Sequence, residues 1–335
     1  MFFTPTRSDW NAFDMMSQHA PERTSASSAH RSLAYGFGAL AALTFCLIVV
    51  GALVRAHDAG LACPDWPLCF GKAVPHFDLK IAFEWGHRVF AGAISLGLAA
   101  LTFLMVRRPD LRRDFRNRLL LIWLVLATQV VFGGLTVLLQ LAPWTVSVHL
   151  ILGNTFCLLL VWTSVDLAQG LHASESMESL SNGPRILSFA VAILVLIQMV
   201  LGGWVSSNYA GLACTHFPTC NGEQWVPTWE GLVGIQILHR INGVLLLVAY
   251  AALALVLWGK GSLGRLSALG LGLVGLQIGV GVANVLLRLP IWVTALHSGF
   301  AAAIVLVTAL CVRGVIRSRR VYGERPATSR MAEAQ

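Results

Sequence analysis

Phe83-Glu84-Trp85-Gly86-His87-Arg88 is the stretch that decides the fold, because it opens a long apolar run that continues to residue 106. A carboxylate, an imidazole and a guanidinium therefore enter the edge of a membrane together. If the run is helical, Glu84 and His87 are three residues apart and project from one face. A second copy, Gln236-Ile237-Leu238-His239-Arg240, keeps the histidine and the arginine but has glutamine in place of the acid. This difference indicates which half of the chain carries out chemistry.

The composition is that of a polytopic membrane protein. Of the 335 residues, 56% are hydrophobic and only 12% are charged, and the mean hydropathy is +0.70. A soluble domain of this size does not need so apolar a sequence. The net charge of +8 could indicate nucleic acid, but the arginines cluster in short segments beside apolar runs, as topology signals do. We therefore exclude a nucleic-acid partner and expect membrane lipid around the chain.

Eight apolar runs follow one another along the chain. Each has roughly 20 residues or more, enough at about 1.5 Å per residue to cross a hydrocarbon core of about 30 Å. We therefore predict an all-α polytopic membrane protein with eight transmembrane helices. The runs lie near residues 33–54, 81–106, 118–140, 146–168, 185–207, 232–258, 266–287 and 291–312.

Arginines and tryptophans predict how the spans are oriented. Eight spans place both termini on one side, and arginine clusters mark cytoplasmic segments. One cluster lies between spans two and three and the other in the C-terminal tail: Arg107, Arg108, Arg112, Arg113, Arg116 and Arg118, then Arg313, Arg317, Arg319 and Arg320. The loops 55–80 and 208–231 then face outward. Six tryptophans fall near that outer face, namely Trp66, Trp85, Trp144, Trp225, Trp229 and Trp292.

The first 31 residues are polar and mixed in charge, unlike a signal or transit peptide. We expect them to be a disordered cytoplasmic tail, and the absence of a targeting peptide favours a bacterial inner membrane. The predicted divisions are a tail (1–31), an N-terminal bundle (32–168), a cytoplasmic linker (169–184), a C-terminal bundle (185–313) and a second cytoplasmic tail (314–335).

The chain repeats itself. Gly60-Leu61-Ala62-Cys63 returns as Gly211-Leu212-Ala213-Cys214, an offset of 214 − 63 = 151. The offset from His87 to His239 is 152, and that from His149 to His297 is 148. Each unit holds four spans, so both halves enter the membrane from the same side. We predict two tandem four-helix bundles related by a pseudo-twofold axis along the membrane normal.

Four of the ten histidines lie inside predicted spans, all at a similar depth near the outer end. They are His87, His149, His239 and His297. Ionisable groups there are costly and are usually functional. Two imidazoles on facing helices of one bundle are what a planar macrocycle needs for axial ligation, which pairs the first two and the last two. The alternatives are four histidines that hydrogen-bond across helices, or a zinc or copper site.

Three arginines lie beside these histidines. Arg88 and Arg240 directly follow the span-two and span-six histidines, and Arg55 ends span one. A haem near the outer surface presents two propionates, which a guanidinium matches in bidentate fashion. The alternative is that these arginines only extend their charge to the membrane surface.

Glu84 is the only carboxylate in a predicted span apart from Asp166. It could move protons, or hold a reactive oxygen species, beside the edge of a macrocycle. Because Gln236 replaces it in the other half, we expect the first half to process a molecule and the second to carry electrons. The alternative is a carboxylate that only pairs with Arg88 or Arg55 at the surface.

Four cysteines lie in the outer loops, as Cys63 with Cys69 and Cys214 with Cys220, each pair with five residues between its members. On the oxidising side of a membrane, two pairs in equivalent loops indicate one disulfide each. Closing such a short loop stabilises by roughly 2 kcal/mol and would fix a lid over each bundle mouth. Redox-active or metal-binding thiols are the alternative.

The Glu-x-x-His-Arg motif, the segment Gly-Leu-Ala-Cys-Pro-Asp-Trp-Pro-Leu-Cys (60–69) and the three further histidines resemble haem A synthase, the cytochrome oxidase assembly enzyme. The resemblance covers about residues 33–312. It implies oxidation of the C8 methyl group of haem O to a formyl group by successive hydroxylations, giving haem A. It also implies haem O as substrate, with haem O synthase and an electron donor, ferredoxin or quinol, as candidate partners.

Carried over by position, the resemblance gives each site residue a role. His87 and His149 would flank the substrate haem, with Glu84 as the essential acid near its methyl edge. His239 and His297 would bind the iron of a haem b cofactor. Cys63 and Cys69 would form a functionally important disulfide, and the second pair, Cys214 and Cys220, is left without an implied role.

Two other classes of protein fit part of the pattern. A dihaem b-type cytochrome that only transfers electrons explains the four histidines equally well, but it explains neither Glu84 nor the outer loops. A transporter built from parallel repeats would need interrupted helices, for which Gly133-Gly134 and Gly279-x-Gly281 are weak candidates.

Overall fold

The computed structural model describes residues 28–169 and 180–323, and every regular element in these ranges is helical. Eight helices are long and apolar enough to cross a membrane, as the sequence predicts. One short 3₁₀ helix, η1 (Ala210–Leu212), lies in the third outer loop. The long helices are α2 (Ser28–Ala56), α3 (Leu79–Val106), α4 (Pro109–Leu138), α5 (Pro143–Gln169), α6 (Asn182–Ser207), α7 (Gly231–Val256), α8 (Gly261–Leu286) and α9 (Ile291–Gly323).

The contacts between the helices form two closed rings of four. Helix α2 contacts α3 and α5, and α4 contacts the same two neighbours. The contacts of α6 with α7 and α9, and of α8 with the same two, repeat this pattern. Between the rings, α2 meets α9, α6 meets α5, and α5 meets α9. Exchanging the two halves leaves this set of contacts unchanged, as the predicted pseudo-twofold relation requires.

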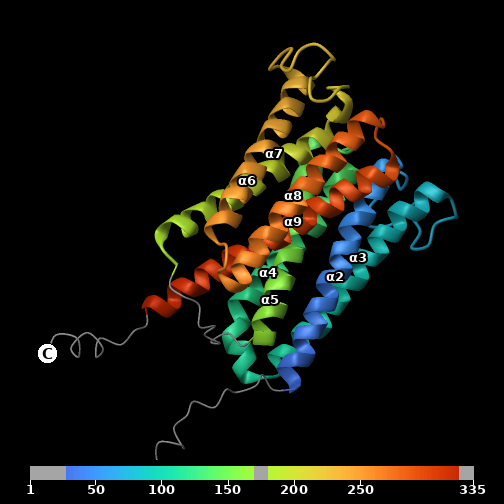
Figure 1. Cartoon of the computed structure of the whole chain (residues 1–335). Helices are drawn as coiled ribbons and strands as arrows, with labels where there is room; N and C mark the ends of the chain where they lie inside the picture. Colours follow the sequence, from blue (N-terminus) through green and yellow to red (C-terminus); the bar gives the residue numbers. More distant parts are fainter. Residues whose placement is uncertain (1–27, 170–179, 324–335) are drawn as a thin grey trace, which may run out of the picture.

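Each ring has its own apolar core. Leu98, Ile122 and Leu160 are among the fully buried side chains of the first, and Tyr250 and Leu253 are among those of the second. Both long loops lie at one end of the bundle, and the turn between α3 and α4 lies at the other (Figure 1). The mouths of the two bundles therefore open at the same end, below the cysteine loops.

Several helix boundaries differ from the predicted spans. Helix α2 begins at Ser28, so residues 28–31 are helical rather than part of a tail. Helix α4 begins at Pro109 rather than near residue 118. Proline is well suited to a first helical turn, and the polar residues after it let the helix extend beyond its apolar run into water. Most of the predicted loop arginines are therefore on an exposed helical extension. Helix α9 continues to Gly323, so 314–323 are helical rather than part of a tail. Residues 1–27, 170–179 and 324–335 of the predicted tails and linker lie outside the described residues.

A buried carboxylate joins the halves at the end away from the cysteine loops. Asp166 of α5 accepts hydrogen bonds from Arg118 of α4 and from Arg313 of α9. Gln169 accepts from Arg313 and from Arg317, each at 2.9 Å. Asp166 and Arg313 are both buried, so this ion pair crosses the boundary between the bundles without facing water.

Polar contacts also cross this boundary at the outer end. The guanidinium of Arg55 donates to the carbonyl oxygen of Ser206 at 2.6 Å and lies 3.8 Å from the ring centroid of Tyr209. The hydroxyl groups of Ser147 and Ser207 are 3.4 Å apart. Arg55 thus holds the end of α2 to the end of α6.

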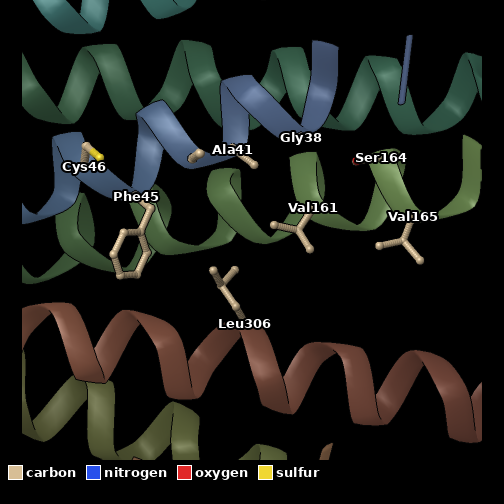
Figure 2. A pocket seen from close by; sticks show the side chains of 9 residues that line it. Gly38, Ala41, Phe45, Cys46, Val161, Ser164, Val165 and Leu306 are labelled. Atoms are coloured by element: carbon tan, nitrogen blue, oxygen red, sulfur yellow. The ribbon is translucent and has the colours of Figure 1, made fainter. Parts of the chain in front are cut away.

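A groove of about 420 Å³ runs between α2, α5 and α9 and is mainly apolar (Figure 2). Gly38, Ala41 and Phe45 line it from α2, and Val161 and Ser164 from α5. At 3.6 residues per turn, these α2 positions point away from the side of the helix that carries Gly51, which packs against His87. The groove is therefore separate from the histidines.

Candidate functional site

The four predicted histidines lie on α3, α5, α7 and α9, two in each bundle, and each packs against a glycine of a neighbouring helix. A Cβ atom built on that glycine would lie only 3.1–3.2 Å from the Cε1 atom of the imidazole. The pairs are Gly51 with His87, Gly133 with His149, Gly202 with His239, and Gly281 with His297. Any larger side chain would push the ring aside, so the glycines determine where the imidazoles sit.

In the first bundle, His149 is held by its neighbour on α4. Its Nδ1 lies 3.2 Å from the backbone carbonyl oxygen of Gln129. A carbonyl oxygen can only accept, so Nδ1 carries the proton and Nε2 has a free lone pair. The side-chain amide nitrogen of Gln129 lies 3.3 Å from that Nε2. This tautomer leaves Nε2 able to bind a metal.

In the second bundle, His239 is held from α6. The amide nitrogen of Gln198 lies 3.2 Å from His239 Nδ1 and 3.4 Å from its Nε2. It also donates to the backbone oxygen of His239 at 3.2 Å. Asn242 donates to the side-chain oxygen of Gln198 at 2.7 Å, which fixes the direction of the glutamine amide.

The two imidazoles of the second bundle have the spacing of an axial pair. The ring centroids of His239 and His297 are 6.4 Å apart. Two metal–nitrogen bonds of roughly 2 Å each, plus half of each ring, span a similar distance. In the first bundle, His87 and His149 lie on α3 and α5, which both contact α2 and α4 as α7 and α9 contact α6 and α8. The Nδ1 atoms of His87 and His297 are buried without a partner. A haem between each pair therefore fits the residues present.

The residues do not form a zinc or copper site of three or more ligands. Within residues 28–169 and 180–323, no group of three His, Cys, Asp or Glu side chains could hold a metal ion. This favours the predicted axial ligation by pairs of histidines over a tetrahedral site.

Glu84 lies one turn before His87 on α3 and is only 5% exposed. Its carboxylate accepts a hydrogen bond from the backbone N–H of Cys63 at 2.8 Å and from the guanidinium of Arg88 at 2.5 Å. Glu84 does pair with Arg88, but as a buried group beneath the first loop rather than at the surface.

Arg88 ties the first loop to α3. Its guanidinium donates to the carbonyl oxygens of Asp65 at 2.8 Å and Leu68 at 2.7 Å, besides Glu84. In the second bundle, Arg240 likewise donates to the carbonyl oxygens of Cys214 at 3.1 Å and Thr219 at 3.2 Å. Both arginines hold loops, and contact between Arg55, Arg88 or Arg240 and haem propionates stays a prediction.

Gln236 occupies the position of Glu84 in the second bundle. Its side-chain nitrogen donates to the carbonyl oxygen of Gly211 at 3.4 Å, and its side-chain oxygen is buried without a partner. The counterpart of the carboxylate is therefore neutral and only weakly bonded to its loop.

Both loop cysteine pairs are joined as disulfides, Cys63–Cys69 and Cys214–Cys220. The first packs on Ile81 and the second on Ile237, each in the first turns of the next helix. In the first loop, the ring of Trp66 lies against Gly134 of α4. The loops therefore cover the mouths of the bundles.

The turn after Trp66 is fixed by Asp65. Its carboxylate accepts hydrogen bonds from the backbone N–H groups of Phe70 and Gly71, both at 2.7 Å. The bond from Gly71 contributes most to lowering the pKa of Asp65 below its usual value. The carboxylate is therefore ionised at neutral pH and keeps this turn in place.

The sequence analysis missed four amide side chains around the imidazoles. Gln129, Gln198 and Gln277 each lie four residues before one of the glycines that seat a histidine, and Asn242 lies three residues after His239. The repeated Gln-x3-Gly spacing could have revealed the three glutamines, whereas Asn242 has no such signal. Gly133 and Gly281, considered above as weak evidence for a transporter, lie instead in uninterrupted helices against histidine rings.

The fold and the site define a polytopic membrane protein of two four-helix bundles, each with a histidine pair suited to axial ligation of a haem. A family model described as "Cytochrome oxidase assembly protein" matches residues 35–82 and 76–309. The chain belongs to this family.

Relatives in three bacteria bear the name heme A synthase. The protein of Shewanella oneidensis is 32% identical over 307 residues, which cover 78% of this chain and 90% of the relative. That of Beijerinckia indica is 27% identical, covering 87% of this chain and 95% of the relative. That of Halalkalibacterium halodurans is also 27% identical, covering 87% and 98%. The similarity thus extends over nearly the whole membrane-spanning part.

Proposed function

We propose that this chain is a haem A synthase, which oxidises the C8 methyl group of haem O to a formyl group for cytochrome oxidase assembly. The family and the names of the relatives support this reaction. Two successive hydroxylations of one methyl carbon give a hydrate, which loses water to leave the aldehyde. The enzyme is an oxidoreductase, and haem O is its substrate.

We assign the reaction to the first bundle because of Glu84. It is the one carboxylate, among the described residues, that is buried at the outer end of the bundles. It lies on the same helix as His87, three residues away, below a loop that keeps water from it. Such a group can take up or release a proton while the methyl carbon is oxidised. Gln236 cannot do this, because an amide does not titrate.

The two histidine pairs take different haems in this proposal. His87 and His149 hold the substrate haem O through their Nε2 atoms, and His239 and His297 hold haem b as a resident cofactor. When bound, haem b supplies one-electron redox chemistry. The second bundle orients its imidazoles through Gly202 and Gly281 and keeps them out of water.

The same arrangement indicates the setting of the enzyme. We place the protein in a bacterial inner membrane, with the arginine-rich helix ends and the termini in the cytoplasm and the cysteine loops outside. Tryptophans at the loop end support this, since Trp144, Trp225, Trp229 and Trp292 are all well exposed there. Haem O synthase and an electron donor, ferredoxin or quinol, would be the partners.

Co-expression with a haem O synthase tests the proposal, followed by extraction and chromatography of the haems. We expect haem A, together with haem b that remains with the purified protein. Each of His239→Ala and His297→Ala should lose the low-spin haem b spectrum while the first bundle stays folded. If haem O persists unchanged in cells that make folded wild-type protein with haem b bound, the chain is a dihaem cytochrome that only transfers electrons.

A further inference from the structure

The glycines that seat the four imidazoles are preceded by a glutamine in three cases and by an apolar residue in one. Gln129, Gln198 and Gln277 each precede, by four residues, the glycine that seats a histidine. The fourth glycine, Gly51, is preceded at the same distance by Leu47. The exception is therefore the seat of His87, the histidine that shares a helix with Glu84.

A second difference falls at the same imidazole. Leu47 corresponds to Gln198 (47 + 151 = 198) and Phe90 corresponds to Asn242 (90 + 152 = 242). Two polar side chains that accompany His239 are thus both apolar beside His87.

In the second bundle the two amides form a brace. The Nδ2 group of Asn242 donates to the side-chain oxygen of Gln198 at 2.7 Å and to the carbonyl oxygen of Leu194 at 3.1 Å. With its oxygen taken, Gln198 must turn its amide nitrogen toward His239, where it meets the imidazole and the backbone oxygen. The brace joins α6 to α7 at the ligand itself.

The first bundle has no such brace. Leu47 and Phe90 pack against the apolar core of that bundle. The Nδ1 atom of His87 is buried and has no hydrogen-bond partner. Packing against Gly51 limits the ring of His87 from one side, but no polar group fixes its rotation.

We infer that the residues at these two positions distinguish the cofactor site from the substrate site, an inference that rests on the proposed function. Gln198 and Asn242 make the second bundle retain its haem, and Leu47 and Phe90 let His87 release a haem. A cofactor must stay through many turnovers, whereas a product must leave.

The physical reason is preorganisation. A histidine already held in position loses less rotational freedom when it binds a metal, and groups behind a ligand commonly change metal affinity by about 10-fold to 100-fold. The amide of Gln198 holds His239 at its backbone oxygen, and no side chain of another helix donates a hydrogen bond to His87 among the described residues. In the first bundle His149, held by Gln129, would then stay bound to the iron while His87 dissociates from it.

The test exchanges the two environments in the full-length purified protein. In Gln198→Leu/Asn242→Phe, transfer of haem b to excess apomyoglobin should be about 10-fold or more faster than in wild type, and the midpoint potential of haem b should shift. If the double variant does not purify as a monodisperse protein, Gln198→Leu alone serves, because Asn242 keeps its bond to the Leu194 carbonyl.

The reverse exchange, Leu47→Gln/Phe90→Asn, should slow the release of haem O from the first bundle by a comparable factor. Tyr250→Phe is the matched control. It removes a buried hydrogen bond to Thr308, of 2.5 Å, in the same bundle, about 16 Å along α9 from His297. It should leave haem b release and potential as in wild type.

Unchanged haem b release and potential in the second-bundle variants, or the same acceleration in Tyr250→Phe, would overturn the inference. The haem A yield of the wild type is measured alongside. A wild type without haem A would refute the proposed function, even where the haem b release rates follow the expected pattern. If the wild type makes haem A but the variants release haem b at the wild-type rate, only the proposed role of Gln198 and Asn242 is refuted.

Discussion

At the scale of single residues, Glu84 and Gln236 are nearly equal in size and differ in what they can do. Glu84→Gln would keep a side chain that fits beneath the loop, and Arg88 would keep its bonds to the carbonyls of Asp65 and Leu68. We expect haem binding to survive, and haem O or its hydroxylated intermediate to accumulate at the expense of haem A. Chromatography of extracted haems measures this.

Gln236→Glu is the matched change in the other bundle, where we expect turnover to stay largely intact. A melting temperature equal to that of the wild type, together with intact loop disulfides, would show that both variants keep the fold. Wild-type haem A from Glu84→Gln, with loss of haem A on substitution of Gln236, would mean that the two halves are assigned the wrong way round.

Gly281 and Gly279 allow a second residue-scale prediction with an internal control. A Cβ on Gly281 would lie 3.2 Å from the ring of His297, whereas a Cβ on Gly279 would meet nothing within 4 Å. Gly281→Ala should therefore displace the imidazole, at an overpacking cost of about 1–3 kcal/mol, and should lower the haem b content or shift its Soret band.

Gly279→Ala should leave haem b content and spectrum as in wild type. Absorption spectra normalised to protein concentration distinguish the two variants. Wild-type spectra from both would show that the imidazole does not depend on its glycine.

At the scale of elements, the start of α3 is built to receive the first loop. Ile81, Glu84, Trp85 and Arg88 have the i, i+3, i+4, i+7 spacing of one helix face, and all four contact the loop. Asp78 caps the same helix by accepting from the N–H of Lys80 at 2.9 Å. The loop and the helix therefore form one unit, which places the carboxylate of Glu84 next to Cys63.

The disulfides give the prediction at this scale. The structure joins four of the seven cysteines and leaves Cys46, Cys157 and Cys311 free. Alkylation of the unfolded protein without reductant should therefore add three adducts by mass spectrometry, and seven after reduction. Seven adducts without reductant, in freshly isolated and active enzyme, would mean that the loop cysteines are free thiols.

At the scale of the whole molecule, the two bundles are joined most firmly through Asp166. Asp166→Ala would leave the guanidinium of Arg313 buried without its carboxylate. Breaking a buried ion pair costs about 3–5 kcal/mol, so the melting temperature in detergent should fall by several degrees. Asp114→Ala, which removes an exposed carboxylate of α4, should change it little.

Scanning fluorimetry of the purified proteins checks this prediction. If Asp166→Ala has the same melting temperature as the wild type, the network does not stabilise the contact between the bundles.

The sequence predicted the eight membrane helices, because a membrane span is specified by a run of apolar residues long enough to cross the bilayer. It also predicted the repeat, since landmarks such as Cys63 and Cys214 recur at a nearly constant offset. Helix ends were less certain. Pro109 and the arginines after it read as a loop, but a helix can extend into water wherever its residues permit.

The sequence by itself also pointed to the residues that we propose carry chemistry, because a histidine or glutamate inside a membrane span is costly and therefore conspicuous. Their partners became visible only in the tertiary structure. Gly51 is unremarkable along the chain, and it matters because helix packing brings it to an imidazole on another helix. That packing depends on side-chain shapes across the whole bundle, which no short stretch of sequence contains.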